Sequence, residues 1–160
     1  MSSAPNIDDG GLQRLAYELS LRALGQQEST LNDLRARTGT LLAASSLVSS
    51  FLGARAVDRG GVTWLAVPAL IAFAGSVIAS LFILLPKSQV IFALRGSVLF
   101  EEEFTDPGGL AETHRRLAYW LEQYRDANQP TVERLFGFYR AAAFALLIEV
   151  VLWSIELALG

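Results

Sequence analysis

Two acidic residues, Glu149 and Glu156, lie in an otherwise apolar stretch of this 160-residue chain. They are seven residues apart, which places both on one face of a helix. A carboxylate at the centre of a membrane costs about 2.5 to 3.5 kcal/mol on insertion scales, so it needs a partner or a path to water. At 1.5 Å per residue, Glu149 would lie roughly 13 Å into a span that starts at Arg140, which is close to mid-depth.

Two roles are open for Glu149. It can accept a hydrogen bond from serines of a neighbouring span, or it can form a cation-attracting or proton-binding group inside an oligomer. Glu156 would lie near the outer interface, as a solvated rim residue or paired with Arg55 or Arg59. The polar residues that we expect along a pore are Glu149, Glu156, Ser46 and Ser50.

A second pattern consists of small residues at steps of four, three, four and three. Small residues let helix backbones approach closely in lipid, where packing rather than hydrophobicity drives association. This face is expected either to pack against another span of the same chain or to form a subunit contact or pore wall. Its members are Gly39, Ala43, Ser46, Ser50 and Gly53.

The composition argues against most other chemistry. The chain has no cysteine and one histidine, and it contains no glycine-rich phosphate loop and no HExxH metal motif. We therefore expect no enzyme activity, no metal site and no cofactor. The net charge of −3 provides no basic face, so no nucleic-acid partner is expected either.

The elements that position these residues are predicted to be membrane helices. Charged residues make up 18% of the chain, below the level of about a quarter that is usual in soluble domains. They avoid three stretches, which we predict to be transmembrane segments at 38–54, 61–86 and 141–159. The expected fold class is an all-α membrane protein with three transmembrane helices and a cytoplasmic helical region. The lipid bilayer is then its first partner.

The three segments differ in character. Residues 61–86 carry no charge, and Pro68 is expected to kink the first turns of this helix. Residues 38–54 are short and rich in serine, so a buried core helix of a soluble protein is the alternative there. Residues 141–159 contain two carboxylates, and the alternative for them is a helix in the interface or packed on the other two.

Basic residues indicate the orientation of the chain, because short loops on the cytoplasmic side of a membrane are enriched in Lys and Arg. Two of the 13 Lys and Arg residues lie in 55–60, predicted to be an external loop. The other 11 lie before residue 38 or between Lys87 and Arg140, so we expect the N-terminus in the cytoplasm. The cytoplasmic parts are a disordered segment at 1–11, a helix at 12–37 and the segment 87–140.

Apolar stripes predict helices in both of the longer cytoplasmic parts. In 12–37 a first stripe is followed by a second one with a shifted phase: Leu12, Ala16, Leu19 and Ala23, then Leu24, Gln27, Leu31 and Leu34. In 87–140 a heptad-like seam is formed by Leu110, His114, Leu117, Leu121 and Tyr124. The two regions are expected to pack on each other or on copies from other subunits.

Three further local features belong to the segment 87–140. Residues 90–104 favour a short hairpin or an irregular return along the membrane surface. Residues 105–107, with Pro in the first turn, predict a helix start. Residues 128–130 are expected to interrupt that helix, and a new helix beginning at Pro130 then runs into the third span.

The phrase LNDLRARTGTLLAASSLVSSFLGA, residues 31–54, resembles the entry to the first span in the transmembrane module of Pycsar effectors and in the related SLATT domains of bacterial antiphage systems. The later part, RRLAYWLEQYRDANQPTVERLFGFYRAAAFALLIEVVLW, is similar to their helix-then-span tail. The resemblance implies an oligomer in the bacterial inner membrane that breaches this membrane. It also implies a trigger from another protein or from a small signalling ligand that binds the cytoplasmic part.

Two functions are therefore expected as alternatives. The first is a homo-oligomeric pore or ion-channel-like effector, with the small-residue face at the subunit contact and Glu149 facing the interior. The second is a non-conducting membrane adaptor whose cytoplasmic helices dock a protein partner.

Overall fold

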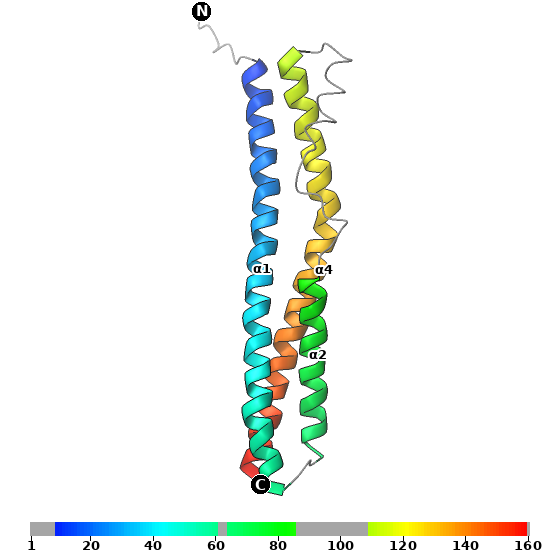
Figure 1. Cartoon of the computed structure of the whole chain (residues 1–160). Helices are drawn as coiled ribbons and strands as arrows, with labels where there is room; N and C mark the ends of the chain where they lie inside the picture. Colours follow the sequence, from blue (N-terminus) through cyan, green and yellow to red (C-terminus); the bar gives the residue numbers. More distant parts are fainter. Residues whose placement is uncertain (1–8, 61–63, 86–108, 160) are drawn as a thin grey trace, which may run out of the picture. The chain divides into compact units, whose positions relative to one another are not determined.

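The computed structural model describes residues 9–60, 64–85 and 109–159 (Figure 1). All regular structure in these ranges is helical, which confirms the all-α expectation for the described residues. The helices are α1 (Asp9–Gly60), α2 (Ala66–Leu84) and α4 (Gly109–Leu159). The predicted hairpin at 90–104 and the predicted helix start at 105–107 lie outside the described residues.

Helix α1 is continuous over 52 residues. The predicted helix at 12–37 and the predicted segment 38–54 are therefore parts of one helix. Residues 55–60, expected to be an external loop, belong to the same helix, as do 9–11, expected to be disordered. No proline occurs between Asp9 and Gly60, and alanine and arginine at 54–56 favour continued helix.

Helix α4 is continuous over 51 residues and contains Pro130. The expected interruption at 128–130 is therefore wrong. A proline in a helix removes one backbone hydrogen bond and crowds the preceding turn. On either side of it, however, Asn128 and Val132 are both buried, so packing of the flanking turns maintains the helix across this position.

Helix α2 is shorter than the predicted segment 61–86 and contains Pro68 in its first turn. An amide at this position has no partner inside the helix, so proline costs no hydrogen bond there. The kink expected at Pro68 is therefore not required. The helix stops at Leu85, whose ψ of 134° is extended, because the following residue is a proline.

The chain divides into two compact units. Unit 1 comprises residues 1–31 and 88–131, and unit 2 comprises residues 32–87 and 132–160. Helices α1 and α4 contribute to both units, and in each unit they run in the same direction. In unit 1, Tyr17 contacts His114 and Gln27 contacts Asn128.

The core of unit 1 is a parallel pair of helices. Its buried residues on α1 follow steps of four, three and four, and those on α4 follow a similar pattern. They are Ser20, Leu24, Gln27 and Leu31 on α1, and Leu117, Ala118, Leu121 and Asn128 on α4. Of the two predicted stripes on α1, the second faces α4, whereas Leu12 and Leu19 of the first are exposed.

Unit 2 contains three helices. Ala66 and Ala69 of α2 form a cluster with Trp153 of α4, and Val48 and Leu52 of α1 pack against it. Nearer the other end of α2, Phe82 stacks on Phe138 with ring centroids 5.2 Å apart. These two contacts show that α2 runs antiparallel to α4, as Figure 1 also shows.

The distribution of side chains in unit 2 is inverted relative to that of a soluble protein. Large apolar side chains face outward, among them Leu47, Phe51, Ile71, Ile78, Phe144 and Leu147. The completely buried residues are mostly small or polar, including Thr38, Ser45, Ser76, Ser80 and Glu149. In water, so large an exposed apolar surface marks an interaction site or a membrane-facing surface.

Two described helices, α2 and α4, are long and apolar enough to cross a membrane. In the most apolar stretch of each helix, 28% of α2 and 22% of α4 is buried inside the structure. The core helix of a soluble protein is mostly buried, so neither helix resembles one. These candidate spans indicate a membrane protein. Helix α1 is not among these candidates in the described part of the chain. The fold therefore provides two candidate spans, and the expectation of three is not confirmed.

Candidate functional site

The most polar site of unit 2 is centred on Glu149, whose side chain is completely buried. The hydroxyl of Ser45 donates a hydrogen bond to its Oε2 at 2.5 Å, and that of Ser49 donates one to Oε1 at 2.7 Å. Ser45 and Ser49 are one turn apart on α1, so a single helix face holds both carboxylate oxygens. Of the two expected roles, a hydrogen bond to serines of 38–54 is the one that the structure shows.

One turn further along α4, Trp153 closes the site. A Cβ built on Gly53 would lie 3.3 Å from Cζ2 of this tryptophan, so the two helices meet there at close range. Trp153 is 2% exposed, and its Nε1 is buried with no hydrogen-bond partner. Glu149, Trp153 and Glu156 follow one another at steps of four and three, so they share one face of α4.

Two serines of α2 face the same interior. Ser76 and Ser80 are completely buried, and their hydroxyl oxygens have no hydrogen-bond partner. Other hydroxyls in the described helices bond to the carbonyl four residues earlier: Thr38 does so at 2.7 Å and Ser46 at 2.9 Å. A buried hydroxyl without a partner costs about 1 to 3 kcal/mol, so this pair requires an explanation.

The small-residue face is divided by the structure. Gly53 is buried against Trp153, which makes it an intramolecular contact. The other four members are exposed in the single chain: Gly39, Ala43, Ser46 and Ser50. A Cβ added to Gly39 would meet nothing within 4 Å. The subunit contact predicted for these four residues stays a prediction.

The sequence predicts Ser46 and Ser50 along a pore and leaves open which serines of 38–54 bond to Glu149. The serines that bond to it are Ser45 and Ser49. A signal for the correct pair was present in the sequence. Buried residues of α1 recur every seven positions, at Leu24, Leu31, Thr38 and Ser45. The buried seam of α1 therefore keeps its heptad phase into unit 2.

Glu156 is 8% exposed, so it is a buried residue and not a solvated one. In the described part of the chain no ion pair joins it to Arg55, and the side chain of Arg59 lies outside that part. The expected rim pairing is therefore not observed with Arg55.

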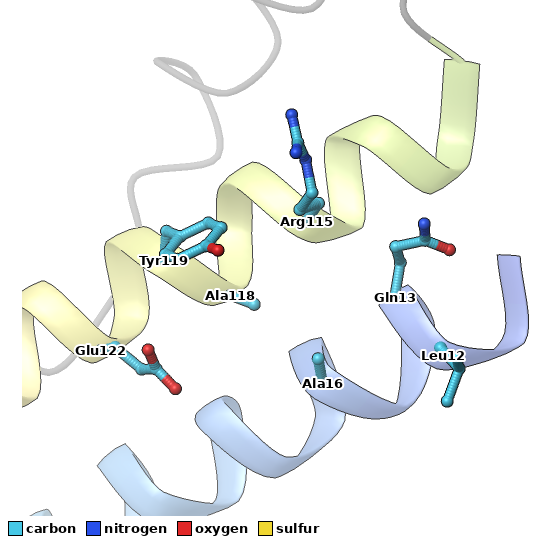
Figure 2. A pocket seen from close by; sticks show the side chains of 7 residues that line it. All are labelled: Leu12, Gln13, Ala16, Arg115, Ala118, Tyr119 and Glu122. Carbon is cyan, nitrogen blue, oxygen red and sulfur yellow. The ribbon is translucent and has the colours of Figure 1, made fainter. Parts of the chain in front are cut away.

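Unit 1 contains an open pocket of about 330 Å³ between α1 and α4. Figure 2 shows its lining, with Ala118 and Glu122 pointing toward α1 and Arg115 pointing away from it. A second pocket of about 300 Å³ shares Ala16 and Glu122 with the first, so the two form one groove. Leu12, Ala16, Leu19 and Ala23, the first predicted stripe of α1, line this groove.

The predicted seam on α4 is divided between the core and the surface. Leu117 and Leu121 are buried against α1, and His114 stacks on Tyr17 with ring centroids 5.4 Å apart. Tyr124 is half-buried, whereas Leu110 is 73% exposed. The buried members determine helix pairing, and Leu110 is accessible to a partner.

A polar layer interrupts the apolar core of unit 1. The side-chain amide of Gln27 donates to the backbone carbonyl of Arg125 at 3.3 Å, and that of Asn128 donates to Gln27 Oε1 at 3.5 Å. Both residues are less than a tenth exposed. Such a layer is known to specify register between paired helices at some cost in stability.

A group of charged contacts in unit 1 lies at the start of α4. Glu112 accepts hydrogen bonds from Arg115 at 2.7 Å and from Arg116 at 3.3 Å. The hydrogen bond from Arg115 is the main reason that the pKa of Glu112 lies below its usual value of 4.5. An acidic side chain in the first turn also complements the helix dipole.

Comparison of the chain with protein-family models, with curated proteins and with solved structures found no match.

Proposed function

We propose that this protein is a three-span, self-associating membrane adaptor that docks a partner protein through its cytoplasmic helix pair. The observation that carries this choice is the environment of Glu149. The residue that favoured a pore in the sequence is buried inside one chain, and both of its oxygens are bonded to serines. The hydrogen bonds that this carboxylate requires are therefore supplied within one chain.

Packing supports a third span. Residues of α1 between 38 and 54 contact both candidate spans: Ser45 and Ser49 bond to α4, while Val48 and Leu52 pack on the cluster that includes α2. If α2 and the C-terminal part of α4 lie in a bilayer, the α1 segment in contact with them lies at the same depth. The segment has no charge between Arg37 and Arg55, and its buried serines supply the donors that a carboxylate in lipid requires.

The groove of unit 1 supports docking. Its walls expose Leu12, Leu19 and Tyr119, each more than half accessible, beside the charged Glu122 and Arg125. An apolar floor with polar margins fits the apolar face of an amphipathic helix. The expected partner is then an amphipathic helix with apolar residues at steps of three and four.

The docking test uses exposed residues, because Leu117 and Leu121 belong to the core and their replacement would test folding. Leu19→Glu and Tyr119→Glu should abolish partner capture from the native host while thermal stability is unchanged. Glu149→Gln should leave capture intact. Capture that survives both groove variants would exclude this site.

The alternative function is a pore, and one observation favours it. The exposed face of α1 carries Gly39, Ala43, Ser46 and Ser50, which are small or hydroxylated and would line the axis of a ring of copies. The resemblance to Pycsar and SLATT effectors points the same way, to an oligomer in the bacterial inner membrane acting in antiphage defence. Dye or ion flux from liposomes reconstituted with the protein, lost on Ser46→Leu, would establish this alternative over the adaptor.

A further inference from the structure

The interior of unit 2 combines one completely buried carboxylate, that of Glu149, with four serine hydroxyls. Ser45 and Ser49 donate to Glu149, which satisfies both oxygens but leaves the negative charge of the carboxylate uncompensated. Ser76 and Ser80 are buried without a partner. The site therefore lacks two things. One is a positive charge to balance Glu149, and the other is a binding partner for the hydroxyl oxygens of Ser76 and Ser80.

No side chain in the described part of unit 2 supplies the positive charge. Helix α2 contains no charged residue. On α1, Arg37 is eight residues from Ser45, about 12 Å at 1.5 Å per residue. Arg55 is six residues from Ser49, about 9 Å, and is exposed. On α4, Arg140 is nine residues from Glu149, about 13 Å. No ion pair of the described residues includes Glu149, so none of these side chains supplies its counter-charge.

The register of α2 places Ser76 within two helical turns of the level of Glu149. Counting along the helices from the Phe82–Phe138 contact puts Ser76 and Glu149 about 8 Å apart along the helix axes, and counting from Ala69 and Trp153 gives about 5 Å. Side chains of helical residues point toward the helix N-terminus, so the Glu149 side chain extends along α4 toward the level of Ser76. Ser80 lies one further turn away.

We propose that Glu149, Ser45, Ser49 and Ser76 form a binding site for a monovalent metal cation of the sodium class. Carboxylate and hydroxyl oxygens are the ligands that hard cations prefer. One carboxylate matches a single positive charge, and the described residues contain no cluster of three acidic or histidine side chains that would suit a divalent ion. The bound cation would neutralise Glu149, and the unpartnered hydroxyl oxygen of Ser76 would coordinate it. The proposal depends on neither docking nor conduction.

Thermal unfolding of the full-length protein in detergent tests this site. Tm is measured in sodium, potassium and choline chloride at constant ionic strength. Because the cation binds the folded state, sodium should raise Tm by about 3 to 6 °C relative to choline at ten times its Kd. The increase should be lost in Ser76→Ala and Glu149→Gln and kept in Ser46→Ala, whose serine lies on the exposed face of α1.

A direct measurement covers the case in which Glu149→Gln does not fold. Radioactive sodium should bind the wild type and Ser46→Ala stoichiometrically, but not Ser76→Ala, which keeps both hydrogen bonds to Glu149. Equal Tm in all three salts, or undiminished sodium binding by Ser76→Ala, would overturn the proposal. A Tm that responds to pH and to no metal cation would overturn it too, because the counter-charge is then a proton.

Discussion

Trp153 of α4 packs against the bare backbone of Gly53 on α1. A Cβ on this glycine would lie 3.3 Å from Cζ2 and 3.5 Å from Cη2 of the indole. The tryptophan is 2% exposed and forms a cluster with Ala66 and Ala69 of α2, so this contact joins all three helices of unit 2. The absence of a side chain at residue 53 is what lets α1 approach so closely.

Replacing Gly53 by leucine should therefore destabilise unit 2. The added side chain would occupy space that Trp153 fills, and overpacking of this kind costs about 1 to 3 kcal/mol. Thermal unfolding in detergent, followed by circular dichroism, measures the loss. The matched control is Gly39→Leu, because Gly39 has open space around it. An unchanged Tm for Gly53→Leu would show that the close approach contributes nothing.

Gly39→Leu has a different expected effect, on self-association. Gly39 and Ala43 belong to the exposed small-residue face, so a larger side chain there would separate two copies in the membrane without affecting the fold of one. We expect a lower oligomer fraction in detergent by analytical ultracentrifugation or chemical crosslinking. Leu47→Ala, on an outward-facing apolar position of the same helix, should leave the fraction unchanged.

Ser45→Ala and Ser49→Ala should each lower stability, since each removes one hydrogen bond to Glu149. Hydrogen bonds to charged groups contribute about 1.5 to 3 kcal/mol in water-soluble proteins, whereas cycles in membrane helices average about 0.6 kcal/mol. The expected loss lies between these values. Ser46→Ala is the control, because the Ser46 hydroxyl bonds only to its own helix backbone, at Leu42. Equal effects at residues 45 and 46 would contradict the arrangement.

Gln27→Leu should destabilise unit 1 when made alone. It removes the hydrogen bond to the Arg125 carbonyl and the one from the Asn128 amide, and such bonds contribute about 0.5 to 1.5 kcal/mol each. Combining it with Asn128→Leu should recover part of the loss, because an apolar layer replaces a polar one. A double-mutant cycle on urea or thermal unfolding measures this coupling, and strict additivity would exclude it.

The pH dependence of unit 1 should include a contribution from Glu112. Its pKa is lowered in the folded state, chiefly by the hydrogen bond from Arg115, so its contribution is present above the unfolded pKa near 4.5 and disappears as pH falls through the folded pKa. Wild type should therefore lose more stability than Glu112→Gln between pH 5 and about 3. The difference should be small and should shrink in high salt, because the pair is exposed to solvent.

Much of the architecture could be predicted from the sequence. The uncharged stretch containing α2 and the continuity of residues 12–54 follow from composition and from the absence of proline in that stretch. The buried phase of α1 was predicted at Leu24, Gln27, Leu31 and Leu34, since apolar residues at steps of three and four need another helix to cover them. Pro130 was misjudged, because local propensity does not include the packing of the turns on either side.

The partners of the polar groups were decided only by tertiary structure. The sequence shows that Glu149 needs a hydrogen bond, but four serines lie within one turn and a half of α1, at 45, 46, 49 and 50. Which two face α4 depends on the rotation of α1, and this is fixed by the heptad phase of its core and by the contact of Gly53 with Trp153. A rotation of 100° separates one residue from the next, so residue types alone cannot identify the bonded pair.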